Sequence, residues 1–314
     1  MSARAACHGK KATQSSKSAA GEQASHCPYA TISAMLPPIR LLAVDIDGTL
    51  LDTRWQLSAA NCAALVAADS RGIEIVLVTG RRFTFARPVA DQLPFDLLLI
   101  VNNGALIKSK TGATFYRQLL SRVIAAGVLR EAADYRHRAM VFFDRSGPGE
   151  VLVEHIDPDY EPVRGYFTRN REFIRQVEHF EDHLAEDPIQ VLFVGQVAPM
   201  RQLAARLENS LLADSISVAL AEYPQRDFTI MDVLARGCSK GAAVAYWAKK
   251  RHLPREEIMA IGDNWNDREM LEFAGLGVVM GNSSEELRRA GWPVTLSNDE
   301  NGVAAAIEKY ILST

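Results

Sequence analysis

From residue 40 onward, short runs of apolar residues alternate with longer segments in which apolar residues recur at helical spacing. The runs at Leu41–Val44, Ile73–Val78 and Leu97–Val101 have the length of buried strands, and the segments at about 59–70 and 83–92 are predicted helices. Strands connected by helices of this length form β-α-β units, whose strands are parallel. The alternation therefore predicts a doubly wound, Rossmann-like α/β core.

The middle of the chain breaks this alternation. Apolar runs at Ala139–Phe143 and Val151–Ile156 flank a turn-forming segment rich in Gly, Pro, Ser and Asp, which predicts an antiparallel hairpin. A helix is expected at about Arg171–Leu184. The next predicted elements are strands at Gln190–Gly195, Ile216–Glu222 and Phe228–Val233 and a helix at Pro199–Leu211. This order indicates an α+β layer inserted into the parallel core.

Strand-helix alternation then resumes and continues to the end of the chain, with a predicted strand at Pro293–Leu296 and a final helix at Gly302–Ile311. The length of 314 residues fits two domains of ordinary size. We expect a core domain of residues 39–112 and 230–314, interrupted by an inserted α+β domain of residues 113–229.

The N-terminal segment has a different composition. Residues 1–38 are rich in Ala, Ser, Lys and Gln and have no hydrophobic periodicity, so they are predicted to be a disordered tail. We expect the functional chain to begin near Met35.

Charge and cysteine content restrict the partners and the compartment. The chain has 35 Lys and Arg against 38 Asp and Glu, a net charge of −3, which argues against a polybasic binder of nucleic acid or of membrane surfaces. No apolar run approaches the ~20 residues that cross a bilayer. The four cysteines form no Cys-x-x-Cys pair and suit a reducing compartment. We expect a cytoplasmic protein without nucleic-acid or membrane partners.

Two carboxylates follow the first predicted strand, at Asp45 and Asp47, and Gly48 then allows a sharp turn. Ligands of open α/β sheets bind at the carboxyl ends of the strands. Two neighbouring carboxylates repel each other, and a hard divalent cation with oxygen ligands relieves that repulsion. The pattern predicts an Mg²⁺ site at this strand end; the alternative is an ordinary Asp-Gly turn.

A second acidic cluster follows the predicted strand at Ile258–Ile261. Gly262 and Asp263 come directly after it, and Asp267 lies four residues beyond Asp263, so both carboxylates can face one site. Oxygen-rich clusters of this kind suit Mg²⁺. The alternative is that these residues only cap the next helix.

Two weaker motifs could hold an anion. Thr79 and Gly80 end the second predicted strand, where a hydroxyl and free backbone N–H groups can hold phosphate, and Arg81 could pair with it. Ser239 can cap the helix that begins at Lys240, and a lysine there can reach an anion as a point charge. Taken singly, a Thr-Gly pair is common at strand ends, and a lysine at a helix start is more often exposed to solvent.

In combination, these motifs resemble those of the haloacid dehalogenase-like hydrolase superfamily, and the resemblance extends from about residue 40 to the C-terminus. The four motifs occur in order, at Asp45-x-Asp47, at Thr79, at Lys240 and at Gly262-Asp263-x3-Asp267.

The insert between the second and third motifs resembles the C2B-type cap of the Cof-like phosphatases. The strings Asn102-Asn103-Gly104-Ala105 and Val279-Met280-Gly281-Asn282 also resemble that subgroup. Asp232 stands where such proteins often carry Glu, which leaves its role open. The implied fold is a Rossmann-like core with an inserted α+β C2B cap.

The resemblance implies a role for each matching residue. Asp45 would be the nucleophile that forms an aspartyl-phosphate, and Asp47 would be the general acid and base. The implied phosphate-binding residues are Thr79, Gly80, Lys240 and Asn266. The implied Mg²⁺ site consists of Asp45, Asp47 through its backbone carbonyl, Asp263 and, in a supporting role, Asp267. Arg81 is a weaker candidate for contact with the substrate.

The implied activity is Mg²⁺-dependent hydrolysis of phosphomonoesters of small metabolites, such as a sugar phosphate or a cofactor phosphate, by a monomer or homodimer. A phosphomutase of the phosphomannomutase type is the nearest enzymatic alternative. A signalling receiver or a non-catalytic binder of phosphorylated ligands is the alternative of another class. Asp47 argues against a receiver, because an acid and base beside the acceptor would shorten the life of the phosphoaspartate.

Overall fold

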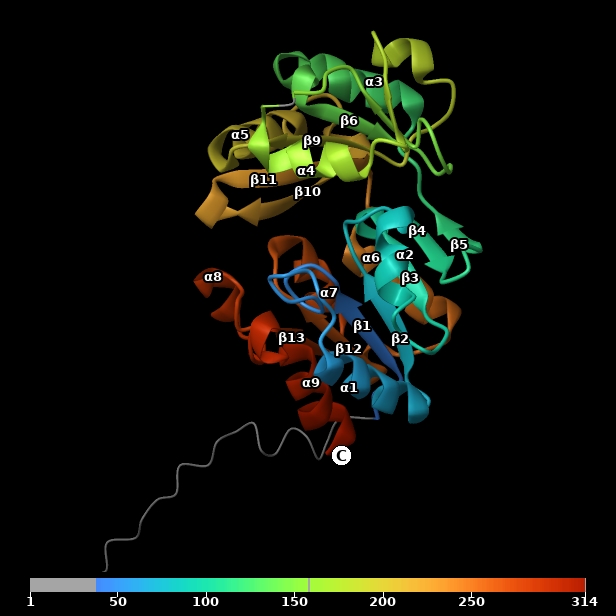
Figure 1. Cartoon of the computed structure of the whole chain (residues 1–314), viewed down its shortest axis with the longest axis vertical. Coiled ribbons are helices and arrows are strands. Elements are labelled where there is room, and N and C mark those ends of the chain that lie inside the picture. The colour runs from blue at the N-terminus through green and yellow to red at the C-terminus, as the bar shows by residue number, and fades with distance from the viewer. Residues whose placement is uncertain (1–37, 158, 314) are drawn as a thin grey trace, which may run out of the picture. The chain divides into compact units, whose positions relative to one another are not determined.

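The computed structural model describes residues 38–157 and 159–313, so the predicted tail lies outside the described residues except for residue 38. The first of two sheets, here the core sheet, is parallel except for an antiparallel hairpin at one edge (Figure 1). Its strands, in spatial order, are β13 (Leu276–Val279), β12 (Ile258–Gly262), β1 (Leu41–Asp45), β2 (Glu74–Val78), β3 (Leu98–Val101), β4 (Leu106–Ser109) and β5 (Thr114–Arg117).

Helices cover both faces of the core sheet. In β1, Leu42 and Val44 pack into one hydrophobic cluster, and Leu41 and Ala43 pack into another on the opposite face. The first face carries α1 (Ala59–Ser70), α2 (Phe83–Ala90) and α9 (Gly302–Ile307). The second carries α6 (Lys240–Lys250), α7 (Arg268–Phe273) and α8 (Glu285–Arg288). Apolar residues on both faces are what a buried parallel sheet requires, and the predicted doubly wound α/β fold is confirmed.

The helices on both faces of the core sheet are short. Within residues 38–157 and 159–313, none combines the length and the apolar character that a membrane-spanning helix requires.

The second sheet, here the insert sheet, is antiparallel apart from its β7–β8 pair. Its strands, in spatial order, are β10 (Ile216–Tyr223), β11 (Phe228–Ala235), β9 (Gln190–Gly195), β6 (Ala139–Phe142), β7 (Val151–Val153) and β8 (Ile174–Gln176). One face packs against α3 (Arg122–Glu131) and α5 (Val197–Glu208), and the other against α4 (Glu161–Arg169). The predicted inserted α+β layer is therefore present.

The chain passes between the two sheets at two neighbouring points. Gln118 follows β5 and donates its side-chain amide to the backbone carbonyl of Arg236, which follows β11, at 2.7 Å. The chain leaves the core sheet after Arg117 and leaves the insert sheet after Ala235. Both points lie several residues later than the predicted domain bounds, which fall between residues 112 and 113 and between residues 229 and 230. The two-domain division itself stays a prediction.

One predicted helix is wrong. The segment Arg171–Leu184 holds the edge strand β8 and a short 3₁₀ helix at Phe180–His183, although Val177 and Phe180 are buried as a helical spacing would require. The edge of β7 offers unpaired backbone groups, and pairing with them outweighs a weak helical preference. The helix of this region is α4, which was not predicted.

The predicted strand at Pro293–Leu296 is reduced to a single bridge between Val279 and Val294. Pro293 has no N–H to donate to a neighbouring strand, which limits pairing at this position.

A buried ion pair joins the core to the insert. Arg82, the residue before α2, places its guanidinium 2.6 Å from Glu150, and both side chains are at most 5 % exposed. Arg82 also donates to the side chain of Asn170, and Thr84 donates to Glu150 at 2.8 Å. The guanidinium stacks on the ring of Phe173 as well.

We expect Arg82→Ala to lower the free energy of unfolding by about 3–5 kcal/mol, because it leaves the Glu150 carboxylate buried without its partner. Denaturant unfolding measures this loss. The matched control is Arg87→Ala in α2, where an exposed pair with Asp91 contributes about 0–1 kcal/mol. Equal losses in the two variants would contradict a stabilising role for the buried pair.

Candidate active site

The candidate site lies where the strand order reverses. From β1, the chain continues to β2 on one side, and β12 joins β1 on the other, with Val44 opposite Ile261. Asp45 is the last residue of β1, and Asp263 follows β12 directly. Side chains at the carboxyl ends of these strands meet at a topological switch point, where open α/β sheets bind ligands.

The turn after β1 brings two loops into contact. Gly48 has φ +80°, and a Cβ atom there would collide with the carboxylate of Asp263. Thr49 is fully buried and donates its hydroxyl to Asp263 Oδ1 at 2.8 Å. Glycine is therefore required at position 48 both by the backbone and by the space available.

Lys240 is the central cation of the site. Ser239 caps α6 by accepting from the backbone N–H of Ala242 at 3.1 Å, which sets Lys240 in the first turn. Its Nζ donates to Asp45 Oδ1 and to Asp267 Oδ1, both at 2.6 Å, and all three side chains are at most 4 % exposed. Burial alone would lower the pKa of Lys240, but the Asp267 and Asp45 carboxylates raise it well above its ordinary value.

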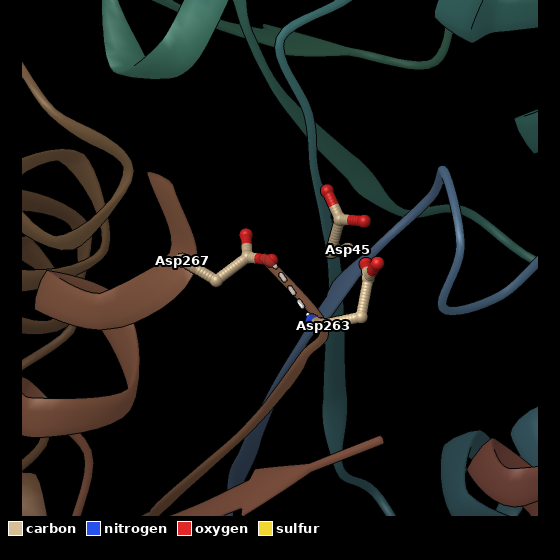
Figure 2. Close-up of side chains that lie close together, drawn as sticks. All are labelled: Asp45, Asp263 and Asp267. Atoms are coloured by element: carbon tan, nitrogen blue, oxygen red, sulfur yellow. Dashed lines mark hydrogen bonds between the residues drawn. The ribbon is translucent and has the colours of Figure 1, made fainter. Parts of the chain in front are cut away.

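Asp45, Asp263 and Asp267 form a three-carboxylate cluster, in which one oxygen of each residue lies within 4.8 Å of the others (Figure 2). Asp267 Oδ2 accepts from the backbone N–H groups of Asp263 and Asn264, both at 3.0 Å, so both Asp267 oxygens are engaged. Asp45 Oδ2 and Asp263 Oδ2 accept from no donor in the described part of the chain. These two oxygens are suited to a hard cation.

The cluster carries more negative than positive charge. Burial and the Asp267 carboxylate raise the pKa of Asp45 to about 7, against the lowering effect of Lys240. Burial and the Asp45 carboxylate likewise raise the pKa of Asp263 well above its usual range. A divalent cation between Asp45 and Asp263 would relieve this repulsion, so the donor set fits Mg²⁺.

The side chain of Asp47 lies outside the cluster. Its two oxygens accept from Arg81 Nε at 2.8 Å and from Arg81 Nη2 at 2.5 Å. The Arg81 guanidinium lies 5.4 Å from the ring centroid of Trp55, an exposed residue with φ +63°. The predicted candidates Asp47 and Arg81 are thus brought together beside the cluster, and both remain partly accessible.

The loop after β2 holds the other predicted anion contacts. Thr79 is fully buried, and its hydroxyl accepts from the backbone N–H of Arg81 at 3.1 Å. A Cβ atom at Gly80 would lie 3.2 Å from the side-chain amide of Asn103, so the loop packs closely on that residue. The backbone N–H of Asn103 also donates to the Thr79 carbonyl at 3.0 Å.

A chain of polar side chains extends from this loop into the insert sheet. Asn266 donates to Asn103 Oδ1 at 3.1 Å, and Asn103 donates to Asp232 Oδ2 at 2.7 Å. Gln190 donates to Asp232 Oδ1 at 2.5 Å. Burial raises the pKa of Asp232 to about 7, although the Asn103 hydrogen bond and Lys240 lower it.

Sequence reasoning assigned no role to Asn103, Gln190 or Tyr223. Asn103 stands in a string noted above for its resemblance to one subgroup, and that was its only signal. Tyr223 ends β10, and burial together with the Asp47 and Asp263 carboxylates raises its pKa. Asn264, beside the cluster, donates to the Glu222 carbonyl at 3.3 Å, which brings the end of β10 to the site.

Comparison with known proteins identifies relatives over most of the chain. A family model described as haloacid dehalogenase-like hydrolase matches residues 42–307. An HMP-PP phosphatase of Citrobacter koseri is 31% identical over 256 residues, covering 79% of this chain and 86% of that protein. The phosphatase YwpJ of Bacillus subtilis is 29% identical over 285 residues, covering 85% and 98%. The 5-amino-6-(5-phospho-D-ribitylamino)uracil phosphatase YcsE of the same organism is 28% identical over 277 residues, covering 87% and 96%.

Solved structures match the fold. A haloacid dehalogenase-like hydrolase from B. subtilis superposes with a TM-score of 0.74 at 25% identity, covering 86% of this chain and 99% of that one. Another from Bacteroides thetaiotaomicron superposes with a TM-score of 0.71 at 27% identity, with the same coverage.

Proposed function

Since the chain belongs to the haloacid dehalogenase-like hydrolase family and is a phosphatase of that family, we propose that it hydrolyses phosphomonoesters of small metabolites through a phosphorylated Asp45. The observation that carries this proposal is the placement of Asp45. Its carboxylate lies in a buried cluster with Lys240 and Asp263, and a partly accessible carboxylate, Asp47, lies two residues further along the chain.

Asp45 and Asp47 have different roles in the proposed reaction. Asp45 attacks phosphorus, the bond to the ester oxygen breaks, and Asp47 gives its proton to the departing alcohol. Asp47 then removes a proton from the water that attacks the phosphoaspartate, which releases inorganic phosphate and restores Asp45. In the structure Arg81 donates to both oxygens of Asp47, so Asp47 has to leave this pair and gain a proton from solvent or from the substrate phosphate before it can act as the acid.

The remaining site residues bind the phosphoryl group or the metal in this proposal. Thr79, Gly80, Lys240 and Asn266 contact the phosphoryl oxygens in this proposal, and Arg81 lies on the substrate side. Mg²⁺ would be held by Asp45, the backbone carbonyl of Asp47 and Asp263, with Asp267 orienting the site, and would neutralise charge on the phosphoryl group. Two engaged oxygens suit Asp267 to that supporting role.

Small metabolites are the proposed substrates because two of the relatives are named for such compounds, HMP-PP and a phosphorylated ribitylaminouracil. The test is incubation of the protein and Mg²⁺ with a panel of phosphorylated metabolites, followed by measurement of inorganic phosphate. Phosphate release equal to substrate loss supports a phosphatase. Conversion of a substrate into an isomer without phosphate release would indicate a phosphomutase instead.

Lys240→Ala is expected to lower kcat/KM by about 10- to 150-fold, because a hydrogen bond from a charged donor contributes about 1.5–3 kcal/mol. The matched control is Lys250→Ala at the other end of α6, where the lysine is exposed. Steady-state hydrolysis of p-nitrophenyl phosphate compares the two variants. Equal rates would remove Lys240 from the phosphate site.

A further inference from the structure

We propose that Asp232, on the insert sheet, is a positioning residue that fixes the amide direction of Asn103 and, through it, the direction of Asn266. This inference rests on the proposed function, in which Asn266 contacts the phosphoryl group. It assigns to the insert a part in phosphate binding that is separate from any contact with the leaving alcohol.

The four side chains form one continuous path. Gln190 and Asn103 each donate to a different oxygen of Asp232, at 2.5 and 2.7 Å, and Asn266 donates to Asn103 at 3.1 Å. Gln190, Asp232 and Asn103 are at most 3 % exposed, so water competes little for these hydrogen bonds.

The carboxylate of Asp232 determines which groups donate and which accept along this path. Both oxygens of Asp232 accept hydrogen bonds in the structure, so Asn103 turns its NH₂ group toward Asp232. The Asn103 carbonyl oxygen then faces Asn266, which donates a hydrogen bond to it from its own NH₂ group. That group carries a second hydrogen, which can be donated to a phosphoryl oxygen.

The backbone of Asn103 is already fixed by other contacts. Its N–H donates to the Thr79 carbonyl at 3.0 Å, and its side chain packs against Gly80. The rotation of the terminal amide is therefore what remains to be set. An amide that is turned by 180° has nearly the same shape, so packing alone distinguishes the two directions poorly, whereas Asp232 distinguishes them because its oxygens accept hydrogen bonds.

The decisive variant is Asp232→Leu, which nearly keeps the volume but offers no acceptor to either donor. The amide of Asn103 then loses the group that sets its direction, and a turned Asn103 presents hydrogens to Asn266. We expect kcat/KM for p-nitrophenyl phosphate to fall about tenfold or more, and inhibition by inorganic phosphate to weaken in parallel. Thr229→Val, a buried change on the opposite face of β11, is the control and should leave both constants near those of the wild type.

A second substitution separates amide direction from general damage to the fold. Asp232→Asn keeps one acceptor, which Asn103 can use when Gln190 turns its carbonyl oxygen toward the new NH₂ group. That oxygen is buried and has no hydrogen-bond partner in the described part of the chain, so turning it breaks no other hydrogen bond. We expect Asp232→Asn to keep most of the wild-type kcat/KM.

The outcomes are distinct. Wild-type kinetics in Asp232→Leu, or an equal loss in Asp232→Leu and Asp232→Asn, would overturn the inference, while a large loss in Asp232→Leu alone supports it. Wild-type protein is assayed first with Mg²⁺ and p-nitrophenyl phosphate. If it releases no phosphate, the proposed function fails; if it does and Asp232→Leu is unaffected, only the positioning role fails.

Discussion

Asp45→Asn is expected to abolish turnover of every phosphomonoester, because an amide cannot serve as the nucleophile and no phosphoenzyme can form. The measurement is acid quenching during turnover of a radiolabelled substrate. The wild type should retain a label that hydroxylamine removes, as it removes acyl phosphates, and the variant should retain none. A labelled Asp45→Asn protein would place the nucleophile elsewhere.

Asp47→Asn should fail at a different step. It keeps the nucleophile but loses the proton donor for the leaving alcohol and the base for water. An alkyl phosphate, whose leaving group needs a proton, should react very slowly. With p-nitrophenyl phosphate the leaving group departs unprotonated, so a burst of about one nitrophenol per active site should precede slow turnover. Wild-type steady-state rates on both substrates would show that Asp47 is neither acid nor base.

Removal of divalent metal is also expected to stop the reaction. Excess EDTA should bring phosphate release close to background, and added Mg²⁺ should restore it. The reason is that three carboxylates face the single ammonium of Lys240. Burial and the Asp267 carboxylate raise the pKa of Asp45 to about 7, against the lowering effect of Lys240. A phosphate dianion would meet net negative charge in such a site.

Asp263→Asn provides the matched control for the metal, because its carboxylate is a proposed ligand but not the nucleophile. Mg²⁺ should raise the melting temperature of the wild type, since a cation that binds only the folded state stabilises it, and should do so much less in this variant. Full activity in excess EDTA would contradict the metal assignment.

The core and the main site motifs could be predicted because their signals are local. An apolar run such as Leu41–Val44 specifies a buried strand, and the carboxylates that follow it need only the strand direction to be placed. The cluster around Asp45 could be expected because parallel strands bring their carboxyl ends to one edge.

The path through Asn103 could not be predicted in this way. Asn103 and Asp232 are 129 residues apart, and Asp232 and Gln190 belong to strands whose pairing is not specified by any local pattern. The same limit explains the segment Arg171–Leu184. Its helical spacing of apolar residues is genuine, but the open edge of β7 decides its structure from a distance.

The two crossings between the sheets lie next to each other, so we expect that the insert could be replaced by that of a relative. Since Gln118 and Arg236 hold both crossings together, an insert from a relative could be spliced in there without moving Asp45 or Lys240. Such a chimera would keep the residues proposed for phosphate hydrolysis and receive new residues on the insert side. The graft must still present an acceptor to Asn103 and a counter-ion to Arg82, which are two design rules for protein engineering.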